Sequence, residues 1–152
     1  MTRRGTAEAV IDQANNWLGF TEGANNTQPF GEWDGYPHGA WCGQFVSWCL
    51  AKAGVEGDWR GVDSQRYPPD AASRWKRLGR WRSDPQRGDL VFFAWGDGGD
   101  WIDHIGIVTG VGDWESRGVV VTIEGNAQPP GGGTQGVYRH HRDRGVIAGF
   151  AR

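Results

Sequence analysis

The residue of this chain best placed to act as a nucleophile is a cysteine at a predicted helix start. Cys42 follows a loop rich in glycine, asparagine and proline and opens the segment WCGQFVSWC, residues 41–49. The free amide hydrogens and the dipole at a helix start stabilise an anion, so they favour a thiolate over a thiol. The thiolate is the nucleophilic form of cysteine. On this placement alone, Cys42 is either a catalytic nucleophile or a buried, unreactive cysteine.

The second cysteine, Cys49, lies seven residues further along the same predicted helix. At a rise of about 1.5 Å per residue, the two Cα atoms lie roughly 10 Å apart. A disulfide needs a separation below about 7 Å, so we expect no bond between Cys42 and Cys49. Cys49 falls on the apolar face of the helix and is predicted to belong to the core.

A nucleophilic thiol needs a proton acceptor, and histidine is the usual one. Of the four histidines, His104 has the most suitable context, in the strand-like segment DHIGIV, residues 103–108. A strand end beside a glycine holds an imidazole rigidly and leaves space in front of it. The remaining histidines lie in a long loop or near the end of a later strand: His38, His140 and His141.

A catalytic histidine also needs a group that orients its second nitrogen. The strand predicted after that of His104 ends in the sequence TIEGN, residues 122–126. If the two strands pair antiparallel, this end approaches His104, which makes Glu124 and Asn126 candidates. Taken alone, Glu124 also fits a surface carboxylate at a strand end.

Other kinds of site lack their sequence signatures. The chain has no Cys-x-x-Cys or His-x-x-x-His spacing for zinc and no Asp-x-Asp-x-Asp-Gly loop for calcium. The glycine-rich segment 96–100 lacks the Lys-Ser/Thr ending of a phosphate loop. We therefore predict no metal and no cofactor. Residues 74–87 hold six basic side chains interleaved with Trp75 and Trp81, which fits a solvated helix face or a site for an anionic polymer such as nucleic acid or a wall polymer.

The elements that position these residues change character along the chain. Apolar residues at helical spacing predict helices over 7–18, 42–53 and 70–78, with Thr6 and Asp70 as N-caps. Pro68 and Pro69 are expected to precede the third helix. Residues 21–40, which are polar and rich in glycine, predict a 20-residue loop.

Short segments rich in Val, Ile, Phe and Tyr predict strands in the second half of the chain. They cover residues 89–95, 104–111, 118–124, 136–141 and 146–150. Helices followed by strands indicate the α+β class with an antiparallel sheet.

Length and composition fit one globular domain. The chain has 152 residues, of which 38 % are hydrophobic and 22 % charged, which excludes a disordered chain. A net charge of −2 excludes a polycation that coats nucleic acid. No apolar run is long enough to span a bilayer, and two cysteines exclude a disulfide-rich scaffold. The N-terminal sequence MTRRGTAEAV lacks the apolar region of a secretory signal.

In this order, Cys42, His104 and Glu124 resemble the catalytic residues of the CHAP domain, a cysteine, histidine-dependent amidohydrolase/peptidase. The resemblance covers nearly the whole chain. It rests on ordered motifs: WLG (17–19), WCGQFVSWC (41–49), GDLVFF (88–93), DHIGIV (103–108) and IEGN (123–126).

The resemblance implies a papain-like α+β fold, with N-terminal helices packed on an antiparallel sheet of about five to six strands, and cleavage of amide bonds in bacterial peptidoglycan. Cys42 would be the nucleophile, His104 the general base and Glu124 the orienting third member. Asn126 would be an auxiliary polar group near the histidine. The amide of Cys42 would contribute to an oxyanion hole, and Tyr36 is a candidate for a second donor.

The same resemblance sets further expectations. Residues 1–152 would form a single catalytic domain without a separate wall-binding domain. Some members bind calcium through an aspartate two residues after the cysteine, but this chain has Gln44 there, so we predict no calcium. Tyr36, Trp41 and Trp101 are candidates to contact the substrate, because sugar rings stack on aromatic faces.

Several alternatives stay open. An NlpC-type stem-peptide endopeptidase usually has a histidine where this chain has Glu124. A non-enzymatic wall- or nucleic-acid-binding module would make Cys42 incidental, and a toxin would imply an immunity partner. The lack of a signal suits a phage lysin made in the cytoplasm and released by a holin-like route, or a domain of a secreted enzyme. Either would act on peptidoglycan as a monomer, without nucleic acid, as an N-acetylmuramoyl-L-alanine amidase or as an endopeptidase.

Overall fold

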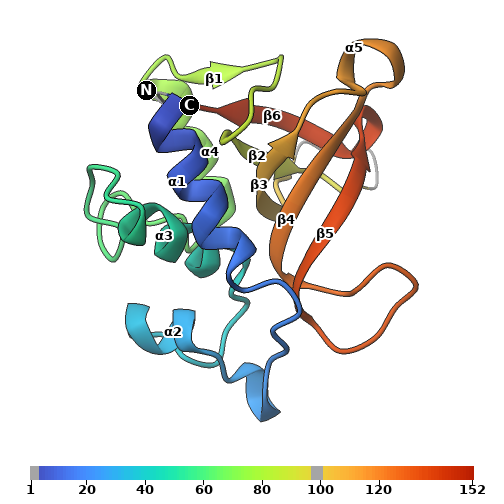
Figure 1. The fold of residues 1–152 in the computed structure, drawn as a ribbon. Helices are drawn as coiled ribbons and strands as arrows, with labels where there is room; N and C mark the ends of the chain where they lie inside the picture. The colour runs from blue at the N-terminus through green and yellow to red at the C-terminus, as the bar shows by residue number, and fades with distance from the viewer. Residues whose placement is uncertain (1–3, 97–100) are drawn as a thin grey trace.

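The computed structural model describes residues 4–96 and 101–152 (Figure 1). Residues 1–3 and 97–100 lie outside the described residues. The second range includes most of the glycine-rich segment that was considered as a phosphate loop. None of the described helices is long and apolar enough to cross a membrane.

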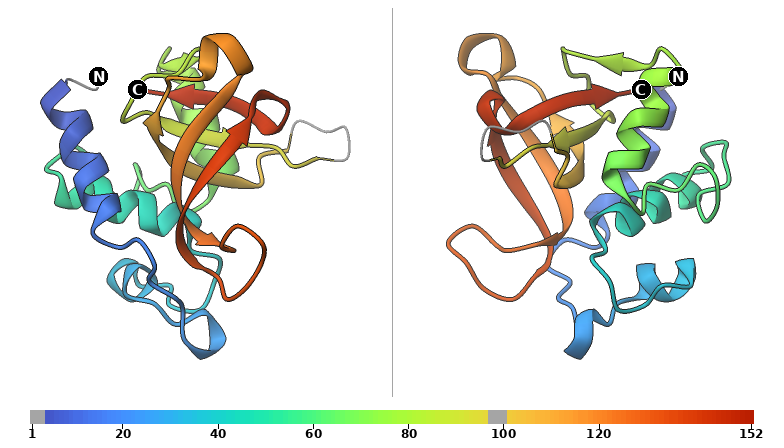
Figure 2. Two further views of the ribbon diagram at one scale, coloured as in Figure 1. Left: turned by 45° about the vertical axis from the view of Figure 1, so that its right-hand side comes forward. Right: turned by 180° about the vertical axis from the view of Figure 1, so that it is seen from behind.

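The sheet has six strands, all paired antiparallel, in the order β1-β6-β2-β3-β4-β5. The strands are β1 (Trp81–Arg82), β2 (Leu90–Phe93), β3 (His104–Gly110), β4 (Val119–Ala127), β5 (Gly136–Asp143) and β6 (Ile147–Ala151). The helices are α1 (Arg4–Asn15), α2 (Pro29–Asp34), α3 (Cys42–Lys52), α4 (Pro68–Arg77) and α5 (Trp114–Arg117), with 3₁₀ turns at Ala24–Asn26 and Arg144–Val146. Helices α1, α3 and α4 lie together on one side of the sheet, as two further views also show (Figure 2). The predicted α+β class, with helices packed on an antiparallel sheet of five to six strands, is confirmed.

Alternation along the strands divides the core in two. Leu90 and Phe92 of β2 belong to the larger cluster, which α1, α3 and α4 cover. Val91 and Phe93 belong to a smaller cluster on the other face, closed by Trp114 of α5. Because side chains alternate, His104, Gly106 and Glu124 share the face of this smaller cluster.

The first helix differs from its prediction at both ends. Thr6 lies inside α1 rather than capping it, and α1 ends at Asn15. After Asn16, the amides bond three residues back, Trp17 N to Ala14 O at 3.1 Å and Leu18 N to Asn15 O at 3.2 Å. The apolar stripe therefore continues, but through a tighter 3₁₀-type turn.

The third predicted helix begins earlier than expected. Pro68 and Pro69 occupy the first positions of α4, and Asp70 lies in its first turn. Proline lacks an amide hydrogen, but the first turn of a helix needs none, and its fixed φ suits that position. Placing both prolines outside the helix was wrong for this reason.

The predicted 20-residue loop contains the helix α2. Pro29 stands at its start, and the side chain of Gln28 accepts a hydrogen bond from the amide of Gly31 at 2.7 Å. Glutamine is not among the usual N-cap residues, so sequence propensity gave no helix signal here.

Candidate active site

Cys42 is the first residue of α3, as predicted, and its side chain is buried at the edge of the core. Gly43 lets this helix start approach a neighbouring segment closely, since a Cβ at that position would lie 1.8 Å from the carbonyl oxygen of Gln65. The first amides of a helix have no acceptor within the helix. A thiolate at Cys42, or an oxyanion formed beside it, therefore meets free N–H donors.

Both cysteines are unpaired, which confirms that they form no disulfide with each other. Cys49 is fully buried on the inner face of α3, and burial raises the pKa of the Cys49 thiol well above its usual value. Cys49 is therefore a core residue, as predicted, and Cys42 is the cysteine that lies beside other polar groups.

His104 begins β3 and its imidazole is held on several sides. Its Nε2 lies 2.9 Å from Oε1 of Glu124. Its ring stacks on Phe93 with a centroid distance of 5.6 Å and lies 5.6 Å from the ring of Trp95. These contacts fix the plane of the ring.

Glu124 is completely buried in β4 and makes four hydrogen bonds. Besides His104, its carboxylate accepts from Oγ1 of Thr122 at 2.5 Å and from Nε and Nη2 of Arg142 at 2.8 and 2.5 Å. Gly106 makes room for it, because a Cβ there would lie 2.7 Å from Cγ of Glu124. A buried carboxylate with this many donors is stabilised in its ionised form.

Charges at the site shift two pKa values in opposite directions. Burial raises the pKa of Glu124, but hydrogen bonds from Arg142 and His104 and their charges outweigh it and bring the pKa to about 2. Burial lowers the pKa of His104, but the charge and hydrogen bonding of Cys42, followed by those of Glu124, raise it to about 9. Cys42 and Glu124 thus act on the same imidazole.

The protonation of His104 follows from these neighbours. An ionised carboxylate only accepts hydrogen bonds, so Nε2 of His104 carries a proton toward Glu124. This leaves Nδ1 as the nitrogen that can exchange a proton with Cys42. The pairing of β3 with β4, Ile107 opposite Ile123, is the antiparallel register that brings the end of β4 to His104.

Asn126 lines the same cavity as His104, but its amide bonds elsewhere. Its Oδ1 accepts from the backbone amide of Trp41 at 2.8 Å, and its Nδ2 donates to Oε1 of Gln135. Of the two candidates to orient the imidazole, the structure places Glu124 against the ring and Asn126 against the residue before Cys42.

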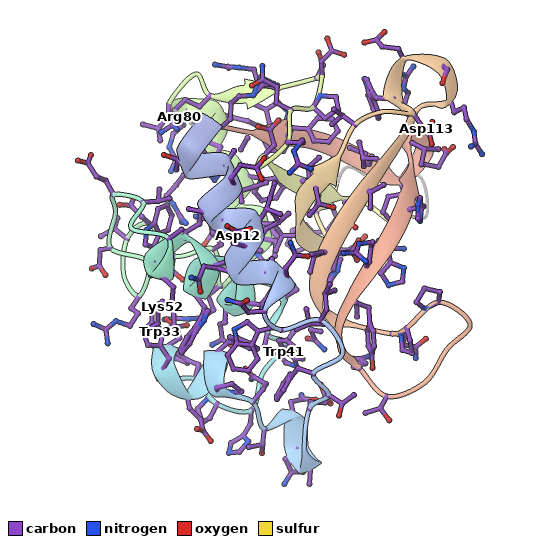
Figure 3. All side chains as sticks on the ribbon, in the orientation of Figure 1. Asp12, Trp33, Trp41, Lys52, Arg80 and Asp113 are labelled. Carbon is purple, nitrogen blue, oxygen red and sulfur yellow. The ribbon has the colours of Figure 1, made fainter. Side chains whose placement is uncertain are left out.

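The three aromatic candidates for substrate contact have different positions. Trp41 is fully buried, stacked on Phe30 at 5.5 Å and bonded through its indole N–H to Glu22 at 2.8 Å. It lies among side chains at the α2 end of the molecule (Figure 3), so no face of its ring is free for a sugar. Tyr36 and Trp101 are exposed, with Arg66 stacked 3.7 Å from the Tyr36 ring.

Sequence reasoning did not place Arg142, which lines the same cavity as His104. Arg142 of β5 bonds Glu124, and Trp95 lies over Arg142 with the guanidinium 4.8 Å from its ring. Arg142 falls in none of the motifs of the sequence. Alternation on β5 was the only signal, since it puts Arg142 and His140 on one face.

A cavity of about 380 Å³ opens beside His104. It is lined by Trp95, His104, Asn126, His140, Arg142 and the loop of residues 127–132. The side chain of His140 donates to the carbonyl of Gln128 at 2.8 Å, which holds the loop against β5. A larger cavity of about 510 Å³ lies among residues of α1, the end of α3 and β6, and none of the candidate catalytic residues line it.

The basic stretch 74–87 packs on its own tryptophans. Lys76 lies 4.7 Å from the ring of Trp81, and Arg80 lies 4.7 Å from that of Trp75. Within residues 4–96 and 101–152, no three His, Cys, Asp or Glu side chains gather in a way that could hold a metal ion.

Comparison with known proteins gives three results. The CHAP domain family matches residues 31–126. A crystal structure from Staphylococcus aureus subsp. aureus Mu50, described as similar to a lipoprotein of the NLP/P60 family, is similar in fold, with a TM-score of 0.51 and 16 % identity. The alignment covers 99 % of this chain and 42 % of that one, so the chain spans less than half of that protein's length. A search of curated proteins finds no match.

The family match spans more than half of the chain and includes the segments that carry Cys42, His104 and Glu124. The structural neighbour supports the papain-like fold and, at its low identity, nothing finer. The chain therefore belongs to the CHAP domain family.

Proposed function

We propose that the chain cleaves an amide bond of bacterial peptidoglycan by a thiol mechanism in which Cys42 is the nucleophile, His104 the acid and base, and Glu124 the group that orients His104. The observation that carries the proposal is the hydrogen bond of 2.9 Å between Nε2 of His104 and Oε1 of Glu124. It leaves Nδ1 of the same ring for Cys42 at the start of α3.

The first half of the reaction forms a thioester. Nδ1 of His104 takes the proton of Cys42, and the thiolate attacks the carbonyl carbon of the substrate. The oxyanion that forms is stabilised by the free amides of the first turn of α3, and one such donor is typically worth a factor of about 10² to 10³ in rate. The C–N bond then breaks, and His104 gives its proton to the leaving amine.

The second half regenerates the enzyme. A water molecule attacks the thioester while His104 accepts its proton, the C–S bond breaks, and the acid product leaves. Glu124 stays ionised throughout, which stabilises the imidazolium each time it forms. Because Glu124 is buried and bonded on both oxygens, the imidazole keeps one orientation through both halves.

Two types of substrate bond fit this chemistry. An N-acetylmuramoyl-L-alanine amidase cuts the lactyl amide of muramic acid, and an endopeptidase cuts within a stem peptide or crossbridge. Both are amides attacked by the same three residues, so the products distinguish them.

Digestion of purified sacculi, followed by mass spectrometry of the released fragments, tests the proposal. The wild type is expected to release muropeptides, whereas Cys42→Ala, which keeps the fold, is expected to release none. Cys49→Ala serves as the matched control for losing a thiol, because Cys49 is buried in α3 away from the site. A free lactyl group identifies an amidase, and a new amine on a stem or crossbridge residue identifies an endopeptidase.

Alkylation gives a second readout that needs no substrate. Iodoacetamide is expected to modify Cys42 in the folded protein and to abolish hydrolysis, while Cys49 stays unmodified. Full activity of Cys42→Ala would refute the thiol mechanism. Intact sacculi from several wall types would instead favour a binding module.

A further inference from the structure

Arg142 donates hydrogen bonds to the same carboxylate that bonds His104. Its Nε lies 2.8 Å from Oε2 of Glu124, and its Nη2 lies 2.5 Å from Oε1. This is a two-point contact between a planar guanidinium and a planar carboxylate, which fixes direction as well as charge. Oε1 therefore lies between two donors, Nη2 of Arg142 and Nε2 of His104.

Arg142 is itself held in place by aromatic rings. Its guanidinium lies 4.8 Å from the ring centroid of Trp95 and 5.5 Å from that of Phe93. Trp95 and Phe93 are stacked on each other at 4.9 Å, and both rings border His104. One pair of aromatic rings thus contacts both His104 and Arg142.

We propose that Arg142 is a positioning residue of the reaction, which acts through Glu124 by keeping that carboxylate ionised and aimed at His104. The inference rests on the proposed function. It extends the three catalytic residues to a row in which Cys42 of α3, His104 of β3, Glu124 of β4 and Arg142 of β5 follow one another.

Sheet order explains how this row forms. β3, β4 and β5 are neighbours, so each contributes one side chain. The charged and titratable groups that act on Glu124 come from both flanking strands: His104 from β3, and Arg142 and His140 from β5. Cys42 of α3 acts through His104. Arg142 is the only permanent cation among them, so its removal changes the charge balance at every pH.

The proposal predicts a specific change with pH. Without Arg142, Glu124 keeps a proton up to higher pH, and a neutral carboxyl stabilises the imidazolium less. The ion pair of His104 with Cys42 is then less favourable at acidic pH. An opposite charge at hydrogen-bond distance typically moves the ionisation of a carboxyl by about 1 to 3 pH units, so Glu124 of Arg142→Gln should ionise at a pH roughly one unit or more higher, and alkylation of Cys42 at acidic pH should be slower than in the wild type.

The test measures the rate of iodoacetamide alkylation of Cys42 against pH, by peptide mass spectrometry, which requires no assumption about the substrate. Arg142→Gln removes the charge, and Arg142→Lys keeps it but cannot bond both oxygens at once. Arg139→Gln is the matched control, because Arg139 lies on the same strand, is exposed and donates a hydrogen bond to Asn15 of α1 at 3.4 Å.

The expected result is a large upward shift for Arg142→Gln, a smaller one for Arg142→Lys and none for Arg139→Gln. Hydrolysis of sacculi by Arg142→Gln at neutral pH should fall by about 10- to 100-fold, because His104 is then less well oriented for proton transfer.

Superimposed pH profiles of alkylation for Arg142→Gln and wild type would overturn the proposal, as would an equal shift in Arg139→Gln. If Arg142→Gln does not fold, Arg142→Lys carries the test, and a profile equal to wild type is then the contrary result. None of the alkylation outcomes depends on the substrate, whereas hydrolysis by Cys42→Ala would refute the proposed function itself.

Discussion

The backbone amide of Trp41 donates a hydrogen bond to Oδ1 of Asn126 over 2.8 Å, which joins the residue before Cys42 to the end of β4. Asn126 has a φ of 53°, in the left-handed region that asparagine tolerates better than most residues. The side chain of Asn126 accepts this hydrogen bond, and its backbone adopts the left-handed conformation. Since Glu124 lies two residues earlier, the same strand end positions the carboxylate and anchors the start of α3.

Replacing Asn126 should separate the effect of its side-chain hydrogen bond from the effect of its backbone conformation. Asn126→Gly removes the amide but keeps the left-handed backbone, whereas Asn126→Ala also adds strain of about 1 kcal/mol. We expect both variants to hydrolyse sacculi about tenfold more slowly, because the start of α3 loses its anchor, and only the alanine variant to show the additional loss of thermal stability. Rate assays with thermal unfolding check this, and a full rate for Asn126→Gly would show that the anchor is not needed.

Gly106 should be required for the position of Glu124. A Cβ at residue 106 would lie 2.7 Å from Cγ of Glu124 and 3.3 Å from the carbonyl oxygen of Ile123. Gly106→Ala is therefore expected to displace the carboxylate from His104, to lower hydrolysis at least tenfold and to destabilise the fold by about 1 to 3 kcal/mol. Gly112→Ala is the control, because a Cβ there meets no atom within 4 Å. Denaturant unfolding and rate assays check both, and an unchanged rate in Gly106→Ala would contradict the role given to Glu124.

The sequence predicted the catalytic elements because each depends on a local pattern. The stripe of Cys42, Phe45, Cys49 and Leu50 defines α3, and all four residues are buried. His104 opens β3, at the predicted boundary. In these elements, hydrophobic periodicity and burial agree.

What the sequence did not reveal depends on longer-range contacts. Arg142 bonds Glu124 only because a loop returns the chain so that β5 pairs with β4, with Thr122 opposite His140. Loop length alone does not fix that register. The two-residue strand β1 was missed because it is defined by pairing with β6 at the end of the chain, Trp81 opposite Ala151. Trp41 was misjudged because tryptophan is used both in cores and at surfaces.

The ion pair between Asp34 and Arg66 should stabilise the fold. Buried Asp34 accepts from Nε of Arg66 at 2.5 Å and from Nε2 of Gln44 at 3.0 Å. Arg66→Met leaves the carboxylate with one donor, which is expected to cost about 1 to 3 kcal/mol. Asp34→Asn in the same chain should recover part of this loss, because no buried charge then remains unpaired. Urea unfolding of the two single variants and the double variant measures the coupling, and strictly additive losses would argue against the pair.

The same contacts predict that activity does not depend on added divalent cations. Gln44 presents amide hydrogens to Asp34 and to the carbonyl of Tyr36 at 3.0 Å each, and the carboxylate already has a guanidinium partner. A cation would have to displace Arg66 to reach it. We therefore predict equal rates of sacculus hydrolysis with EDTA, with calcium and with neither, and a rate that falls in EDTA and recovers on adding calcium would contradict this.

Among the neighbours that raise the pKa of His104, Cys42 should have the largest effect. Burial lowers it, but Cys42 first and Glu124 second raise it from its usual 6.5 to about 9. A raised pKa means that the folded state binds the proton more tightly, so this contribution to stability is complete below about pH 6.5 and is lost as the pH rises through about 9. The lowered pKa of Glu124 contributes above its usual 4.5 and is lost as the pH falls through about 2.

Cys42→Ala removes the larger of the two raising influences on His104 and leaves Glu124 in place. We expect the imidazole of that variant to titrate at a clearly lower pH than in the wild type, as followed by the NMR signals of its ring carbons and assigned by their loss in His104→Asn. Cys49→Ala should leave the titration unchanged, because Cys49 is buried in the core seven residues further along α3. If His104 titrates at the same pH in Cys42→Ala and in the wild type, the thiol does not act on Nδ1, and the proton transfer that begins the proposed reaction has no support.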